Sequence, residues 1–221
     1  QWEQSGLAEA VTRIVVGVSG TEAEFAEVKA AVPRKAEVVW HGLDCLWELP
    51  TLAMARAWAV ENPDDFILYH HTKGAMKNEG ITRFWRDEMR YFCVDRWCEC
   101  VAELRAGCDL VGSHWLTEEH FPRVGSVPFF AGNFWGSTAA YLAALPNPTD
   151  VPNMEALTGS KGRFIAEPWV GIGTRGRRVE VMDWNPGWPT VALCVNPLLA
   201  ARKVARMAQA RRRTRRLGPL P

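Results

Sequence analysis

Apolar and polar positions alternate in blocks along the first half of the chain, and each block has the length and period of one secondary-structure element. Short runs of strand-favouring residues predict strands over residues 13–20, 36–42, 65–71 and 108–116. Helical periods predict helices over residues 21–32, 49–62 and 82–104. Strands and helices that take turns in this way predict an α/β layer structure with a mainly parallel sheet flanked by helices.

The longest predicted helix runs from Thr82 to Leu104 and has one apolar face. Its apolar residues follow the helical period through about six turns, with charged residues on the opposite side. The apolar set is Trp85, Met89, Phe92, Cys93, Trp97, Cys100, Val101 and Leu104. Thiols in such positions act as small hydrophobic groups, so we expect Cys93 and Cys100 to be buried.

The pattern loosens after Leu116. Residues 117–128 contain Pro and Gly and predict a long loop, a kind of segment that often forms a mobile lid in enzymes. Residues 129–146 then predict an aromatic strand, a tight glycine turn and a helix capped by Ser137 or Thr138. The chain of 221 residues, with 48% hydrophobic content, can build one sizeable core.

Charge divides the chain into an acidic body and a basic tail. Residues 197–221 hold eight basic residues and no acid, which leaves 18 basic against 25 acidic residues, a net charge of −7, in residues 1–196. We therefore predict one domain over residues 1–196 and a basic C-terminal helical tail over residues 197–221. The cluster Arg211–Arg216 can hold anionic lipid or nucleic acid through many weak phosphate contacts. The alternative is a solvated helix end that frays into disorder.

Cysteine spacing and hydropathy bear on the compartment. The six cysteines show no C-x-x-C spacing, which argues against a zinc ribbon and a redox motif. The sequence shows no secretory leader and no apolar run near the length of about 18 residues that a membrane span needs. We therefore expect a cytoplasmic protein without a transmembrane segment, peripheral to a membrane if the basic tail binds lipid.

The strand predicted over residues 65–71 ends in polar chemistry. In open α/β sheets, ligands bind in the crevice outside the carboxyl ends of the strands. Thr72, Lys73 and Gly74 can offer a hydroxyl, a cation and a bare backbone to a diphosphate. His70 and His71 point to opposite faces, so one should face the site, and His71 is a candidate metal ligand. The alternative is an ordinary strand end with hydrogen-bonded surface histidines.

Six short segments of the chain occur in a fixed order. They are LWELPTL (46–52), FILYHHTKG (66–74), WRDEMRYFCVDRW (85–97), DLVGSHW (109–115), FFAGNFWGSTAAYLAALP (129–146) and RFIAEPWVG (163–171). Together they resemble a group of small bacterial and viral proteins regarded as nucleotide-sugar glycosyltransferases of the GT-A type, over about residues 5–171. The resemblance implies a GT-A-like, Rossmann-like sheet and transfer of a sugar from a nucleoside-diphosphate donor to a hydroxyl acceptor.

Two features depart from that group. The chain begins at QWEQSGL, which looks like the helix after the first GT-A strand, and His-His-Thr-Lys stands where the usual Asp-x-Asp metal motif is expected. A metal ion at that place neutralises the diphosphate as it leaves. Lys73 can supply part of that positive charge, so we expect a site that is independent of metal or only weakly assisted by a divalent cation such as Mg2+ or Mn2+.

Two later segments supply candidate sugar and acceptor residues. In the turn AGNFWG, Gly132 lets the backbone approach a ligand, Asn133 offers a donor and an acceptor, and Trp135 offers a flat wall to a sugar ring. The alternative is a strand-to-helix corner with Trp135 in the core. Glu167 lies in the apolar segment FIAEPW, and similar proteins have an acid near this point, so it is the candidate general base. The competing interpretation pairs Glu167 with Arg163.

The segment around Pro50 holds two more candidates. The resemblance implies that Glu48 and Thr51 meet the nucleotide, whereas the simpler interpretation places Glu48 at the positive end of the helix as a cap. Arg86 and Arg90 lie one helical turn apart and can either reach a phosphate or form a solvated face.

Two classes of function remain open from the sequence. The first is a cytoplasmic glycosyltransferase whose acceptor is a glycan, lipid-linked or polynucleotide hydroxyl. In it Lys73 stabilises the departing diphosphate and Glu167 takes the acceptor proton. The alternative is a non-catalytic module that binds nucleic acid or membrane through its basic tail, with steeply salt-dependent affinity.

Overall fold

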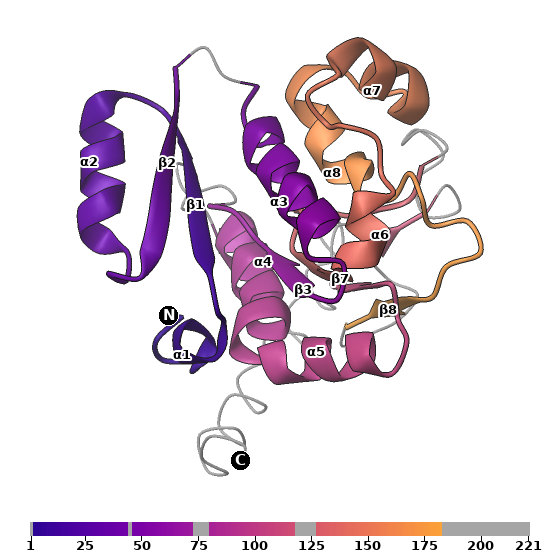
Figure 1. Cartoon of the computed structure of the whole chain (residues 1–221), viewed down its shortest axis with the longest axis horizontal. Coiled ribbons are helices and arrows are strands. Elements are labelled where there is room, and N and C mark those ends of the chain that lie inside the picture. Colours follow the sequence, from indigo (N-terminus) through magenta and orange to yellow (C-terminus); the bar gives the residue numbers. More distant parts are fainter. Residues whose placement is uncertain (1, 44–45, 73–79, 118–126, 183–221) are drawn as a thin grey trace.

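The computed structural model describes residues 2–43, 46–72, 80–117 and 127–182 (Figure 1). The helices are α1 (Leu7–Ala10), α2 (Glu22–Ala31), α3 (Leu49–Glu61), α4 (Gly80–Arg90), the π-helix η1 (Tyr91–Asp95), α5 (Trp97–Arg105), α6 (Ala139–Ala143), α7 (Val151–Thr158), the 3-10 helix η2 (Gly162–Ile165) and α8 (Ala166–Trp169). The strands are β1 (Ile14–Ser19), β2 (Ala36–Gly42), β3 (Phe66–Tyr69), β4 (Leu110–Gly112), β5 (Trp115–Leu116), β6 (Phe129–Phe130), β7 (Trp135–Thr138) and β8 (Val179–Val181). The mixed α/β class is confirmed.

The described strands form small sheets of mixed direction. β1 and β2 are parallel, whereas β3, β7, β4 and β8 form a second sheet in that order, and β5 pairs with β6. In the second sheet β7 runs antiparallel to both of its neighbours, and β8 runs parallel to β4. The sequence predicts a mainly parallel sheet. The difference lies in β7, which follows β6 after only four residues and lies between β3 and β4 antiparallel to both.

β3 lies between two helical layers. Ile67 and Tyr69 face the largest core cluster, which α3, α6 and α8 share with β7, whereas Leu68 faces Leu104 of α5 on the other side. Alternate residues of a strand point to opposite faces, so both faces of β3 are covered by helices. Figure 1 shows α3 and α6 side by side over this sheet, with α5 below them.

The predicted helix over residues 82–104 is in fact two α-helices joined by a π-helical turn. Four consecutive residues, Tyr91, Phe92, Cys93 and Val94, are buried there, and one α-helical stripe cannot bury four neighbours in a row. The wider π turn allows it, and the Cys93 thiol approaches the carbonyl oxygen of Phe134 at 3.6 Å. Burial of Cys93 and Cys100 is confirmed.

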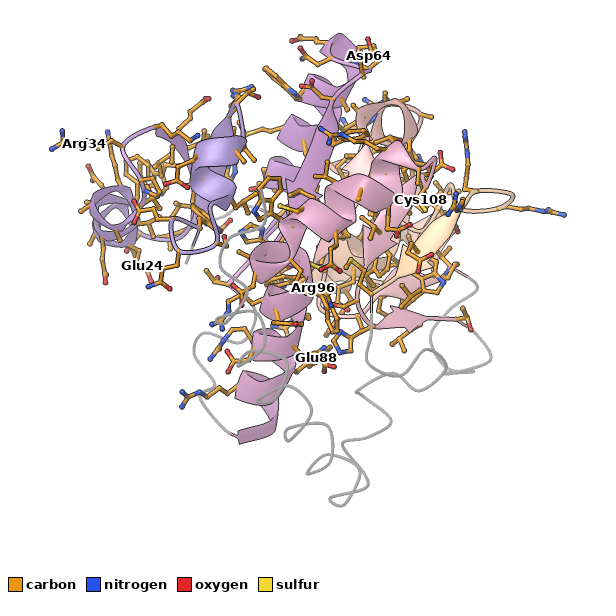
Figure 2. All side chains as sticks on the ribbon, turned by 90° about the horizontal axis from the view of Figure 1, so that it is seen from below. Glu24, Arg34, Asp64, Glu88, Arg96 and Cys108 are labelled. Atoms are coloured by element: carbon orange, nitrogen blue, oxygen red, sulfur yellow. The ribbon has the colours of Figure 1, made fainter. Side chains whose placement is uncertain are left out.

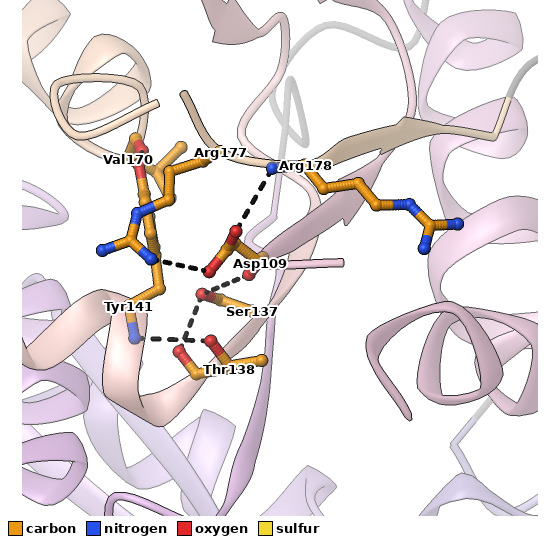
Figure 3. Close-up of polar contacts among 7 residues, drawn as sticks. All are labelled: Asp109, Ser137, Thr138, Tyr141, Val170, Arg177 and Arg178. Carbon is orange, nitrogen blue, oxygen red and sulfur yellow. Dashed lines mark hydrogen bonds and ion pairs between the residues drawn. The ribbon is translucent and has the colours of Figure 1, made fainter. Parts of the chain in front are cut away.

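Asp109 attaches β8 to the rest of its sheet (Figure 3). Its backbone N–H donates to the carbonyl oxygen of Arg178 at 2.9 Å, and its carboxylate accepts from the Arg178 backbone at 3.2 Å and from the Arg177 guanidinium at 3.4 Å. Its own carbonyl oxygen accepts from the Ser137 hydroxyl and the Thr138 backbone, both at 3.1 Å. One residue at the start of β4 therefore connects β4 to both strands beside it.

Local signals agree with several predicted boundaries. Thr138 caps α6 by accepting from the Tyr141 backbone N–H at 3.3 Å, which selects one of the two predicted caps. The strand predicted over residues 108–116 is divided into β4 and β5 at His114, whose φ of 63° interrupts the extended conformation.

Some predictions cannot be compared with the described chain. The basic tail over residues 197–221, the domain boundary at residue 196 and most of the loop at residues 117–128 lie outside the described residues. Within the described residues, no helix combines the length and the apolar character needed to cross a membrane.

Candidate functional site

The side chain of Glu48 joins three elements at the carboxyl end of β3. Glu48 is the N-cap residue of α3, yet its carboxylate makes no capping hydrogen bond. Its Oε1 lies 3.2 Å from Nδ1 of His71, and its Oε2 accepts from the Tyr69 hydroxyl at 3.0 Å and from the Asn133 amide at 2.8 Å. Glu48 therefore stands at the positive end of α3, as the simpler interpretation has it, but its carboxylate makes its hydrogen bonds with the end of β3 and with the turn before β7.

His71 is fixed at both ring nitrogens. While Nδ1 faces Glu48, Nε2 lies 2.9 Å from the carbonyl oxygen of Gly132. A carboxylate and a carbonyl are both acceptors, so each ring nitrogen of His71 faces an oxygen partner. A metal ion at His71 would have to displace one of these oxygen partners, so this arrangement disfavours His71 as a metal ligand.

His70 makes different hydrogen bonds from His71, although both rings lie near Phe134 and both line the groove described below. Its Nε2 accepts from the indole N–H of Trp2 at 2.6 Å, and its ring packs against Phe134. Burial and the nearby positive charge of His71 lower the pKa of His70 to about 4. His70 therefore stays neutral at physiological pH. Its hydrogen bond with Trp2 connects the N-terminal segment to the end of β3.

The turn AGNFWG supports the site from inside the protein. Asn133 and Trp135 are both fully buried, and the Trp135 indole donates to the Asn133 side-chain oxygen at 2.7 Å. The Trp135 ring stacks on Tyr69 with 5.0 Å between ring centroids. Trp135 is thus a core residue and not the predicted wall for a sugar. The side-chain amide of Asn133 donates its hydrogen bond to Glu48. The corner alternative for this turn describes the structure better.

Gly132 is required by its backbone and its packing. Its φ is 95°, and a Cβ there would come within 2.2 Å of the Met89 sulfur. The sequence analysis explained this glycine by the close approach of a ligand to the backbone. In the structure it is α4 that approaches the backbone closely.

One groove collects five of the ten predicted site residues. It has a volume of about 1820 Å³ and is lined by Glu48, Thr51, His71, Thr72 and Glu167, and also by Arg86, Arg90 and Arg163. Within it Thr51 contacts Nε2 of His41 at 3.0 Å. The Arg163 guanidinium lies over the ring of Phe164, with 4.9 Å to the centroid. Lys73 and Gly74 lie outside the described residues, directly after Thr72.

Two exposed aromatic residues of this groove escaped the sequence analysis. Trp47 is 49% exposed and Phe164 is 62% exposed, and both line the groove beside Glu48 and Glu167. Trp47 has a φ of 50°, an uncommon conformation for a bulky residue. Their positions in the sequence could have indicated that they are exposed, because both aromatic residues stand next to polar candidates and outside any regular apolar stripe.

A second polar pair lies beneath α4 and outside the groove. Glu88 of α4, which is labelled in Figure 2, and His114 are each fully buried. Oε2 of Glu88 lies 3.0 Å from Nε2 of His114, and Nδ1 of His114 lies 3.1 Å from the Ser113 hydroxyl. The sequence analysis assigned no role to these residues. They connect α4 to the corner between β4 and β5.

One group of potential metal ligands occurs in the described residues, at the edge of the second sheet. Glu103, Cys108 and Glu180 place one potential ligand atom each within 4.8 Å of one another, and Cys108 is marked in Figure 2. Burial raises the pKa of the Cys108 thiol, which disfavours the thiolate that a metal requires. The Arg178 guanidinium, 4.0 Å from Glu103, supplies a positive charge, so we assign no metal here.

Comparison with known proteins places the chain in a family without a described activity. No curated protein and no solved structure matches the chain. A family pattern matches residues 3–172, a range that includes the described residues of the groove except Trp2. The chain therefore belongs to the family defined by the domain of unknown function DUF8361.

Proposed function

We propose that this chain is a GT-A-type glycosyltransferase domain that moves a sugar from a nucleoside-diphosphate donor to a hydroxyl acceptor. One observation carries the proposal: the carboxyl end of β3, the start of α3 and Glu167 of α8 open into the same groove. Sites for charged ligands form where strand ends and helix starts converge in this way. The resemblance of six ordered segments to GT-A enzymes supports the same activity.

The donor diphosphate lies against the positive side of the groove in this proposal. His71, held between Glu48 and Gly132, lines this part of the groove together with Thr72, and Lys73 follows in the chain. Fixed cations and hydroxyl groups stabilise the charge that develops on the leaving diphosphate. Mg2+ or Mn2+ then has an assisting role at most, because protein groups supply the positive charge. The exposed ring of Trp47 suits stacking on the nucleotide base.

Glu167 takes the acceptor proton in the proposed reaction. The acceptor oxygen forms a bond to the anomeric carbon, the bond from that carbon to the diphosphate oxygen breaks, and the diphosphate leaves with the electron pair. The proton of the acceptor hydroxyl passes to the Glu167 carboxylate. The partly exposed position of Glu167 on the groove, near the ring of Phe164, supports this assignment.

The acceptor and the location follow from sequence alone. We keep the cytoplasmic location expected from the sequence, and an anionic acceptor or surface bound through Arg211–Arg216.

Donor binding is the first experiment. The purified chain is heated with UDP-, GDP-, CDP- and dTDP-sugars, each with MnCl2, with MgCl2 and with EDTA. We expect one nucleotide class to raise the melting temperature, with a stabilisation of about 2.7 kcal/mol when the ligand is at one hundred times its dissociation constant. No shift with any donor, under any metal condition, would overturn the proposal.

Two variants then divide binding from chemistry. We expect Lys73→Ala to weaken donor binding and turnover. Lys161→Ala, which changes an exposed lysine after α7, is the matched control.

We expect Glu167→Gln to keep the donor-induced shift in melting temperature but to lower sugar transfer by about 100-fold or more. Glu27→Gln, on the exposed side of α2, is its control. Unchanged transfer by Glu167→Gln would remove this residue from the mechanism.

A further inference from the structure

Three sulfur atoms come together where α5 packs against the second sheet. The Cys100 thiol lies 3.3 Å from the sulfur of Met182, the residue that follows β8. Met182 packs both against the buried cluster that contains Cys93 and against the one that contains Cys100. Here we call Cys93, Cys100 and Met182 the sulfur cluster. It lies apart from the group formed by Glu103, Cys108 and Glu180, because its ligand atoms are all sulfur.

A bend in the helical layer brings the two cysteines together. Cys93 and Cys100 are seven positions apart, which in a straight α-helix is about 10.5 Å along the axis. The chain instead turns at Arg96, whose φ of −113° is not helical, and Figure 1 shows α5 crossing below α4. Across this bend the Cys100 thiol approaches the carbonyl oxygen of Phe92 at 3.4 Å, beside Cys93.

The two thiols interact directly. The hydrogen bond with Cys93 is the largest cause that raises the pKa of the Cys100 thiol, and burial raises it further. At Cys108, in contrast, burial is the largest cause. The raised pKa of Cys100 thus reflects a second sulfur beside it, with a proton held between the two. A soft metal ion can replace a proton in such a position.

A small cavity gives access to the sulfur cluster. It has a volume of about 300 Å³, and Phe92 and Met182 form part of its wall. Its lining also includes the charged side chains Arg96, Glu99, Glu103 and Glu180. The side chains of Glu99 and Glu103 are 38% and 39% exposed, so the cavity is open to solvent. Arg96 pairs with Glu99, and Arg178 lies 4.0 Å from Glu103, which leaves one net negative charge beside the entry.

We propose that the sulfur cluster binds a soft monovalent metal ion, and that this ion is Cu(I). Thiolate and thioether sulfur atoms favour Cu(I), whereas the carboxylates of the cavity suit harder ions such as Mg2+. Structural zinc sites almost always have four ligands, and the cluster offers three. On binding, each thiol releases its proton to solvent and its sulfur forms a bond to the metal ion. The copper stays Cu(I), so nothing is oxidised or reduced.

The geometry needs only a small adjustment. Metal–thiolate bonds of about 2.3 Å place three ligand sulfur atoms about 4 Å from one another. The sulfur atoms of Cys100 and Met182 lie 3.3 Å apart, and the flexible methionine side chain can move by the difference. Arg96 lowers the pKa of Cys100, so its positive charge stabilises the thiolate. The inference does not depend on the proposed glycosyltransferase activity, because the described lining of the groove does not include the sulfur cluster.

A copper titration of the full chain tests the proposal. The reduced protein is titrated with Cu(I) in the absence of oxygen, in competition with the chelator bathocuproine disulfonate. We expect the chain to retain one copper ion, and X-ray absorption at the copper edge should show three sulfur neighbours at about 2.3 Å. Nitrogen or oxygen neighbours, or no retained copper, would overturn the proposal.

Variants of the ligands separate this site from the other cysteines. We expect Cys100→Ala to lower the Cu(I) affinity at least about 100-fold and Met182→Leu at least about tenfold, each with the loss of one sulfur neighbour. Met182→Leu conserves side-chain volume, so it tests the site even if Cys100→Ala impairs folding. The controls Cys98→Ala, at an exposed position of α5, and Cys108→Ala should leave the affinity unchanged. Equal affinity of Met182→Leu and the wild type, or a loss caused by either control, would overturn the proposal.

Discussion

Glu48 gathers three hydrogen-bonding partners from parts of the chain that are far apart in sequence. Tyr69, His71 and Asn133 all contact its two carboxylate oxygens, and Asn133 is separated from it by 85 positions. Burial raises the pKa of Tyr69, and the negative charge of Glu48 raises it further, so the phenol keeps its proton and remains a donor. The candidate site is therefore also a structural joint.

Removal of the Glu48 carboxylate should destabilise the protein. Glu48→Ala leaves the buried amide of Asn133 and the hydroxyl of Tyr69 without their acceptor. We expect the free energy of unfolding to fall by about 2–4 kcal/mol, measured by urea denaturation. Glu27→Ala, on the exposed side of α2, should change it by about 0.5 kcal/mol or less. Equal stability of the Glu48→Ala variant and the wild type would contradict the observed network.

His70 should make stability depend on pH between about 4 and 6.5. The pKa of His70 is lowered from 6.5 to about 4 in the folded protein, chiefly by burial. As the pH falls below 6.5, His70 becomes protonated in the unfolded chain but stays neutral in the folded protein. The free energy of unfolding therefore decreases until the pH reaches about 4. The full loss is about 3 kcal/mol, and it is absent above pH 6.5.

The variant His70→Gln isolates this effect. Burial lowers the pKa of His41 in the same direction, so the quantity to measure is the wild-type stability minus that of His70→Gln at each pH. That difference should shrink as the pH falls from 7 toward 4. A constant difference across this range would show that His70 titrates normally in the folded state.

The packing of α3 on β1 depends on one glycine. A Cβ at Gly17 would lie 1.9 Å from the Thr51 hydroxyl oxygen and 2.6 Å from Nε2 of His41, although the sequence around Gly17 reads as an ordinary strand. The helix and the strand were both predicted correctly, but nothing in their local patterns indicates how closely they approach.

Gly17→Ala tests this contact. We expect a loss of about 1–3 kcal/mol in the free energy of unfolding, because the new methyl group overpacks the interface. Thr51→Ala in the same chain should recover part of the loss, with a coupling energy of at least about 0.5 kcal/mol in a double-mutant cycle. Additive losses from the two changes would place the strain elsewhere.

The π turn between α4 and α5 shows a different limit of local patterns. The apolar period over residues 82–104 fits a single α-helix, and most residues of the set do face the interior. The four buried neighbours from Tyr91 to Val94 reveal the wider turn only because Phe134 and the second sheet pack against them. A helical period in sequence thus predicts which side is buried but not a change of helical type within it.

Taken as a whole, the molecule distributes its core unevenly between its two larger sheets. All three residues of β4 are buried, and so are three of the four residues of β7. In contrast, β1 has one buried residue, and neither β2 nor α2 has any. Burial of apolar surface is the main source of stability, so the β1–β2 sheet should open more readily.

Native-state hydrogen exchange can measure this difference. We expect amides of β1 and β2 to exchange at least about tenfold faster than those of β4 and β7, under conditions where local opening limits exchange. Equal protection in both sheets would show that they unfold as one unit.

Local patterns along the chain were sufficient for the positions of most elements and for several candidate residues. Apolar period and turn residues fix the strands at 14–19 and 36–42 and the helix at 49–61 close to their predicted bounds, because backbone hydrogen bonding and side-chain size act over a few neighbours. The polar end of the strand also indicated His71, whereas Glu48 became a candidate through the resemblance to GT-A enzymes. The sequence also kept open the core position of Trp135, which the structure selects.

Long-range packing decided the rest. The antiparallel insertion of β7, the contact of Glu48 with Asn133 and the exposure of Trp47 all depend on residues tens of positions apart. Each of these depends on which distant surfaces exclude water together, and a local period carries no information on that choice. For this reason the amino-acid sequence identifies the candidate chemistry, whereas only the folded chain shows which groups share a groove.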